Sequence, residues 1–257
     1  MMLGSTYYIV CFFVIGLFFG SFYNVVSLRV PKKESILYPP SHCPKCNHKL
    51  SWYELIPVLS YIFLLGRCKK CRCKISFIYP FIEILTGILF AVCYYVFGFS
   101  IDLIYALIFI SGLLIIIIAD FKYMIIPDEI IIFLGISLFL LKIFTTDFGT
   151  ALIFLFNGGL SFLIMYIVKI LGDLSFKKES LGGGDVKLMF IFGLVFGVEV
   201  SVIIIFLSSI IAFPVALFLL IRKKTSILPF GPFLAIVAIT LFLLNITFDD
   251  ILTFLFL

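Results

Sequence analysis

Long apolar runs recur along this chain and are separated by short polar stretches. Eight runs are present: Tyr7–Leu28, Ile78–Phe97, Ile101–Ala119, Ile130–Phe144, Ala151–Leu171, Val186–Gly197, Val200–Ile221 and Pro229–Ile246. A helix of about 20 apolar residues crosses the roughly 30 Å hydrocarbon core of a bilayer. The pattern therefore predicts an all-α polytopic membrane protein with about eight transmembrane helices, the fourth and sixth of them short.

The composition agrees with a membrane protein. The chain is 63% hydrophobic and 13% charged, whereas soluble domains carry about 25% charged residues. No basic region precedes Tyr7–Leu28, so this run is predicted to be a retained anchor and not a cleaved signal peptide.

Positive charge is concentrated in one segment, which predicts the orientation. Arg29–Lys74 holds ten of the 19 Lys and Arg residues and only two acids. Basic loops stay in the cytoplasm, so we expect this segment inside and the N-terminus outside. Eight crossings then place the other basic loops inside, with Lys142 as the exception. Topology and anionic lipid explain the net charge of +5, and we expect no nucleic-acid partner.

One polar, cysteine-rich insert divides the chain. We expect a first transmembrane helix over residues 1–28, a cytoplasmic loop over 29–77 and a transmembrane core over 78–257. The insert contains five of the seven cysteines, in the motifs CPKC and CKKCRC.

The spacing of these cysteines indicates a zinc ribbon. Two CxxC pairs are separated by 21 residues, close to the roughly 15–20 of known ribbons. The predicted ligands are Cys43, Cys46, Cys68 and Cys71. Structural zinc is the favoured interpretation because cytoplasmic disulfides are rare, and a redox or unliganded role is the alternative. Cys73 is a spare thiol, and His42 and His48 are expected to be solvated loop residues.

Ionisable residues at membrane depth are functional candidates because burying them is costly. Asp120 ends a run of apolar residues, and Asp128 follows Pro127, where it is also a candidate helix cap. Asp185 follows three glycines, which we expect to adopt positive φ and to approach a substrate closely. By topology, Asp120 and Asp185 both lie at the cytoplasmic face.

Two carboxyl groups that meet at one buried site share a proton and can perform aspartic peptidase chemistry. From the residue types alone, three interpretations are open for Asp120 and Asp185. They form a catalytic dyad, they line an ion or proton path, or they are unrelated helix caps.

The motifs together resemble the type IV prepilin peptidases, the bifunctional leader peptidase/N-methyltransferases of pilus, secretion and competence systems. The segments that carry the resemblance run in the family's order: GSFYNVVSLRVP (Gly20–Pro31), Cys43–Cys71, ISFIYPFIEILTG (Ile75–Gly87), DFKYMIIPD (Asp120–Asp128), LGGGDVK (Leu181–Lys187) and LPFGPFLA (Leu228–Ala235). The departures are few: Tyr23 replaces a usual leucine, Ser180 replaces a usual alanine, and Cys73 is extra.

The resemblance implies a multi-pass enzyme of the bacterial cytoplasmic membrane. Asp120 and Asp185 would be the catalytic pair, with Gly182 and Gly184 shaping the second. The substrates would be prepilins and pseudopilins, cleaved after a glycine that follows a basic leader. The new N-terminus would then be methylated from S-adenosylmethionine, with the cysteine loop as part of the methyltransferase and the assembly machinery as a partner.

Other polar residues have alternative roles. Glu83 is either buried by a partner or close to methyl transfer, and Asn24 either fixes helix packing or contacts substrate. Lys187 is expected to reach the cytoplasmic face or to pair with a carboxylate. Acidic residues beside the dyad, Asp128 and Glu179 among them, are hypothesised to bind the basic leader.

Three alternatives differ in class or activity. One is a leader peptidase without methylation, which would lack the cysteine loop. Another is a proton or ion transporter that uses the intramembrane acids, a class in which internal repeats are common; no convincing repeat is present. The third is a zinc-stabilised scaffold without enzymatic activity.

Overall fold

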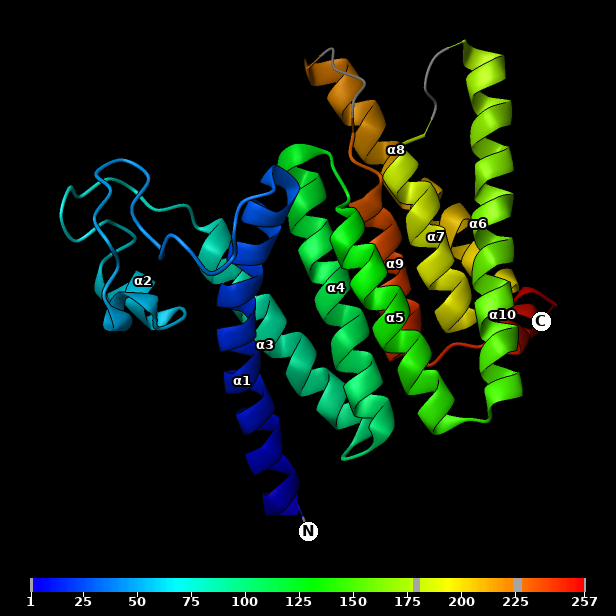
Figure 1. Ribbon diagram of the computed structural model, residues 1–257, viewed down its shortest axis with the longest axis horizontal. Helices are drawn as coiled ribbons and strands as arrows, with labels where there is room; N and C mark the ends of the chain where they lie inside the picture. The colour runs from blue at the N-terminus through cyan, green and yellow to red at the C-terminus, as the bar shows by residue number, and fades with distance from the viewer. Residues whose placement is uncertain (1, 178–180, 224–227, 257) are drawn as a thin grey trace. The chain divides into compact units, whose positions relative to one another are not determined.

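The computed structural model describes residues 2–177, 181–223 and 228–256, and these residues contain helices and no β-strand. The long helices are α1 (Met2–Arg29), α3 (Ile78–Phe97), α4 (Ile101–Tyr123), α5 (Asp128–Thr145), α6 (Phe148–Phe176), α7 (Gly183–Phe196), α8 (Val198–Lys223) and α9 (Gly231–Leu243). A short α10 (Phe248–Phe256) follows them (Figure 1). The predicted all-α class is confirmed.

Each of the eight predicted spans corresponds to one helix, but their lengths differ. Five of the described helices, α1, α3, α4, α6 and α8, are long and apolar enough to cross a membrane. The other three predicted spans are not such candidates. Helices α7 and α9 are too short, with 14 and 13 residues, and α5 carries three charged side chains. The α10 helix was not predicted.

By their contacts, the residues form two compact units, Met1–Leu107 and Ile108–Leu257. The boundary between Leu107 and Ile108 lies inside α4. The functional division into an anchor, an insert and a membrane core stays a prediction.

In the first unit, α1 packs closely against α3. A Cβ atom at Gly16 would lie 2.7 Å from the Gly87 Cα atom, and one at Gly20 would lie 2.7 Å from the Glu83 Cα atom. Gly16 and Gly20 form a GxxxG pattern, which lets two helix backbones approach each other in a membrane. This contact places the end of α1 beside Glu83.

The insert is built from short turns. It contains the 3-10 helices η1 (Val30–Lys32) and η2 (Trp52–Leu55) and the helix α2 (Leu59–Phe63). Isolated antiparallel bridges, His42 with Lys49 and Arg67 with Lys74, close the two CxxC turns. Each cysteine pair is therefore held in its own small hairpin.

In the second unit, α7 is the central helix. It contacts α5, α6, α8 and α9, and most of its side chains are buried, including Leu188, Ile191 and Phe192. Figure 1 shows α7 among these neighbours. A helix that is hydrophobic on all sides is suited to this position, which explains why a helix of only 14 residues is stable here.

We expect Gly20→Leu to destabilise the first unit because the new side chain would overlap the α3 backbone. Overpacking of this kind costs about 1–3 kcal/mol. Thermal unfolding in detergent micelles should show a lower midpoint for Gly20→Leu. Gly159→Leu is the control, since Gly159 lies on α6 with open space beside it. Equal midpoints for Gly20→Leu and the wild-type chain would contradict the close contact.

Candidate active site and metal centre

The structure brings the two predicted aspartates together inside the second unit. Asp120 lies in the last turn of α4 and Asp185 lies in the first turn of α7. They are buried, with exposed fractions of 5% and 7%, and their carboxyl groups are close enough to interact electrostatically. Two acidic side chains that are distant in sequence therefore share one buried site.

A third element, the first turn of α9, completes this site. A Cβ atom at Gly231 would lie 2.7 Å from Asp120 Oδ2 and 3.4 Å from Asp185 Oδ1. The backbone amide of Gly231 is also close enough to the Asp120 carboxylate to interact with it. At this position of α9 only glycine fits, because a side chain would overlap the Asp120 carboxylate. The sequence analysis gave Gly231 no role; its signals were the Gly-Pro pair that opens a short apolar helix and its place in the family-like segment Leu228–Ala235.

The glycines before Asp185 act differently from the prediction. None of Gly182, Gly183 and Gly184 has a positive φ, so the expected left-handed turn is absent and that expectation was wrong. Gly184 is required for space, because a Cβ atom there would lie 2.8 Å from the Cβ atom of Ile126. The Asp185 amide donates to the Gly182 carbonyl oxygen at 3.2 Å, and the Asp185 carboxylate lies against Gly182.

Asp128 and Lys187 form an ion pair at the edge of this site. Lys187 Nζ donates to Asp128 Oδ1 at 2.6 Å, and the two side chains are 45% and 59% exposed. Pro127 is the N-cap residue of α5 and no side chain caps this end, so the Asp128 carboxylate pairs with a lysine and does not cap the helix. The pair links α5 to α7. Glu179 and Ser180 lie outside the described residues.

The four predicted cysteines converge in the first unit. The Sγ atoms of Cys43, Cys46, Cys68 and Cys71 all lie within 4.8 Å of one another. Cys43 and Cys71 are 3.8 Å apart, and Cys46 and Cys68 are 3.9 Å apart. A disulfide requires about 2.05 Å, whereas a tetrahedral zinc ion with Zn–S bonds of about 2.3 Å places its sulfurs about 3.8 Å apart.

The spacing therefore fits a zinc ion. Backbone N–H groups of Cys46 and Lys45 hydrogen bond to the Cys43 sulfur and lower the pKa of its thiol to about 6, which favours the thiolate that metals bind. The His48 amide acts in the same direction on Cys46, but burial and the neighbouring cysteines outweigh it and raise the pKa of the Cys46 thiol to about 11. Cys73 Sγ lies 3.6 Å from Cys43 Sγ, although it is outside the cluster of four. Neither histidine of the insert belongs to the described cluster.

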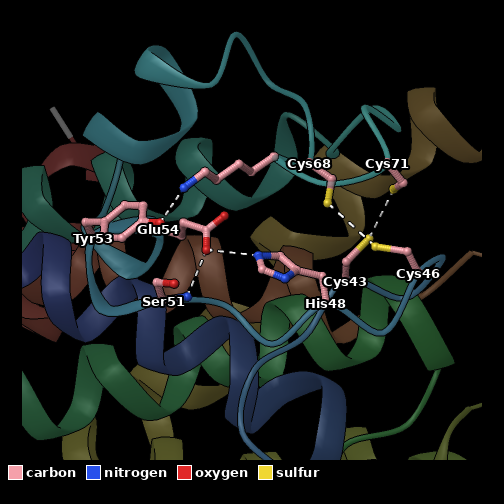
Figure 2. A network of polar contacts seen from close by, with 9 residues as sticks. Cys43, Cys46, His48, Ser51, Tyr53, Glu54, Cys68 and Cys71 are labelled. Atoms are coloured by element: carbon pink, nitrogen blue, oxygen red, sulfur yellow. Dashed lines mark hydrogen bonds and ion pairs between the residues drawn. The ribbon is translucent and has the colours of Figure 1, made fainter.

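A hydrogen-bond network lies beside the cysteines (Figure 2). Glu54 Oε2 accepts from the Ser51 amide at 2.8 Å and interacts with His48 Nε2 at 3.2 Å. Burial raises the pKa of the Glu54 carboxyl, but these hydrogen bonds outweigh burial and the net pKa is lowered. Glu54 is thus an anion beside the cysteine cluster, a residue that the sequence analysis did not select.

Glu83 and Asn24 lie on the facing helices α3 and α1. Glu83 Oε2 accepts a 2.7 Å hydrogen bond from the Val58 amide, and Val58 has a φ of 60°, which is unusual for a β-branched residue. Asn24 Nδ2 donates to the Tyr79 carbonyl oxygen at 3.3 Å. The Glu83 hydrogen bond therefore connects the strained turn at Val58 to α3, and the Asn24 hydrogen bond connects α1 to α3.

Two family models match the chain. Residues 14–97 match the bacterial peptidase A24 N-terminal domain, and residues 107–219 match the type IV leader peptidase family. No solved structure matches the chain at a significant level.

Curated relatives match over most of the length. A prepilin leader peptidase/N-methyltransferase of Bacillus subtilis (strain 168) is 35% identical over 245 residues, covering 94% of this chain and 95% of the relative. One from Vibrio cholerae is 32% identical and covers 80% of this chain and 84% of the relative. One from Myxococcus xanthus is 41% identical over 184 residues, with coverages of 70% and 54%.

We expect the four-cysteine cluster to hold about one zinc ion per chain. Cys46→Ser and Cys71→Ser should each lower the zinc content of the purified protein towards zero, because three ligands hold the ion more weakly than four. Elemental analysis of dialysed protein gives the measurement. Cys11→Ser, on α1 and outside the cluster, is the matched control. Zinc content that is the same in all the variants would exclude this ligand set.

Proposed function

Because this chain belongs to the type IV leader peptidase family, we propose that Asp120 and Asp185 are the catalytic pair of a membrane-embedded aspartic endopeptidase. Its substrates are prepilins and pseudopilins, from which it removes a basic leader after a glycine. The observation that supports these residue roles is the convergence of both carboxylates on Gly231 inside one buried site.

The geometry supports the general acid–base chemistry of a carboxyl pair. One carboxylate takes a proton from water, whose oxygen attacks the scissile carbonyl carbon. The protonated partner donates to the carbonyl oxygen, and the leaving amine takes up a proton when the C–N bond breaks. Close packing against Gly231 restrains the two carboxylates, so little reorganisation is needed during the reaction.

The proposed location is the bacterial cytoplasmic membrane, with the catalytic pair at the cytoplasmic face. The basic residues of Arg29–Lys74 support this orientation. A basic leader remains on the cytoplasmic side, so the peptide bond after its glycine must be cleaved at that face. The partners of the enzyme are its prepilin substrates and the pilus or secretion machinery that assembles them, and no nucleic acid.

The second proposed activity is methylation of the new N-terminal amine. S-adenosylmethionine supplies an electrophilic methyl group, and the zinc-stabilised insert with Glu83 and Asn24 belongs to this activity. The match of residues 14–97 to the bacterial N-terminal domain favours methylation over a leader peptidase that lacks it. The family assignment likewise disfavours a transporter.

We expect Asp120→Asn and Asp185→Asn to abolish leader cleavage, because an amide can neither accept nor supply the required proton. Co-expression with a prepilin, followed by mass analysis of its N-terminus, measures this. Both variants should still methylate a substrate that begins at the mature residue, which shows that they are folded. Leader cleavage by both variants would refute the pair.

We expect Gly231→Ala to reduce cleavage about 100-fold or more, since a displacement of about 1 Å in a catalytic group has an effect of this size. The added methyl group would lie against Asp120 Oδ2. Gly159→Ala, in open space on α6, should cleave at the wild-type rate. Measured rates for the two variants that do not differ would rule out the contact between α9 and the catalytic pair.

A further inference from the structure

The first unit contains a cavity that is separate from the catalytic pair of the second. Its volume is about 500 Å³, and its walls come from the end of α1, the start of α3 and the insert. Small-molecule sites have volumes of roughly 300–1,000 Å³. Cys43 and Cys68 contribute to the wall, so the proposed zinc site stabilises one side of the cavity.

Two buried carboxylates line this cavity. The Glu54 side chain is 1% exposed. Its Oε2 atom takes part in the network of Figure 2, whereas Oε1 is buried and has no hydrogen-bond partner within the described residues. Leaving a buried charged oxygen without a donor is costly. A ligand with hydroxyl or ammonium groups would supply the missing hydrogen bond.

Glu83 is the second carboxylate and is 8% exposed. Its hydrogen bond to the Val58 amide holds a backbone conformation with positive φ. Strained backbone of this kind persists where the surrounding structure fixes it, and it is frequent at binding sites. Glu83 therefore shapes the cavity and gives it a second carboxyl group.

The rest of the lining has a different character. Lys45 and Lys74 line the cavity from the insert, are exposed and form no ion pair within the part of the chain that the structure describes. Tyr79 adds an aromatic ring from α3. The cavity thus combines buried anions, exposed cations and an aromatic side chain.

This combination discriminates between ligand classes. Two buried carboxylates would repel a nucleotide phosphate. S-adenosylmethionine fits better, because it carries a sulfonium, an ammonium group and two ribose hydroxyls, together with one carboxylate and a flat adenine ring. The opposite charges of the ligand and of the cavity complement each other.

We propose that this cavity binds S-adenosylmethionine, with Glu54 and Glu83 facing its hydroxyl and cationic groups and Lys45 and Lys74 facing its carboxylate. This assignment rests on the proposed methyltransferase function and gives it a location. It also assigns binding roles to Glu54 and to the two lysines, and it places the donor in the unit that contains the cysteine cluster.

Equilibrium dialysis of radiolabelled S-adenosylmethionine against the full-length, zinc-loaded protein in detergent tests the proposal without relying on turnover. Glu54→Gln and Glu83→Gln should bind about 10- to 100-fold more weakly, as expected for a lost hydrogen bond to a charged group. Glu34→Gln, an exposed acid of the insert that does not line the cavity, should bind as the wild-type chain does.

A steric variant avoids the risk that loss of a carboxylate unfolds the insert. Ser76→Trp adds bulk at an exposed lining position and should abolish binding. Ser100→Trp is matched to it, since both serine hydroxyls accept a hydrogen bond from a nearby helical amide and Ser100 does not line the cavity. Retained zinc and retained leader cleavage show that the variants are folded.

The outcomes separate the two proposals. If the wild-type chain binds the donor and all three cavity variants bind it equally well, the cavity assignment is overturned and methylation stands. If the wild-type chain neither binds the donor nor methylates a cleaved substrate, the proposed methyltransferase function fails, and the assignment fails with it. Ultraviolet cross-linking of the labelled donor should mark peptides within residues 21–83, and a label confined to residues 108–257 would also overturn it.

Discussion

Two helix N-termini face one pair of buried carboxyl groups, and the second unit is organised around this contact. Asp185 lies in the first turn of α7, and the Gly231 amide at the start of α9 reaches Asp120. The partial positive charge at a helix N-terminus stabilises a nearby anion. Asp120 needs this support, because it lies in the last turn of α4, where the helix dipole opposes a negative charge.

The close approach of these helices depends on residues that lack side chains. Ile126, in the loop after α4, packs against both Gly184 and Gly231. Larger residues at either glycine would move α7 or α9 away from the carboxylates. Packing in this unit therefore determines the geometry of the proposed peptidase site, because protein interiors are dense and cannot absorb an added methyl group without movement.

The first unit also stabilises buried acids, but it does so with backbone amides of the insert. Its buried acids, Glu54 and Glu83, receive hydrogen bonds from backbone amides of the insert, and its cysteines are gathered at distances that suit a metal ion. Most apolar side chains of the insert are exposed, among them Trp52, Phe63 and Leu65, so the insert has little apolar core and bound zinc would supply much of its folding free energy. The residues proposed for the two activities thus belong to different units.

The sequence by itself determined the helical class, the position of each long helix, the four converging cysteines and the two aspartates that meet. These features follow from local information, since hydrophobic periodicity, CxxC spacing and the cost of a charge in an apolar run are all visible within short segments. Only the tertiary structure showed that Gly231 touches the aspartates and that Gly184 is needed for space and not for positive φ. It also showed that one buried oxygen of Glu54 has no hydrogen-bond partner among the residues that the structure describes. Each of these depends on contacts between segments that are distant in the chain or on burial by the folded insert, and no local pattern encodes which backbone will lie against a given side chain.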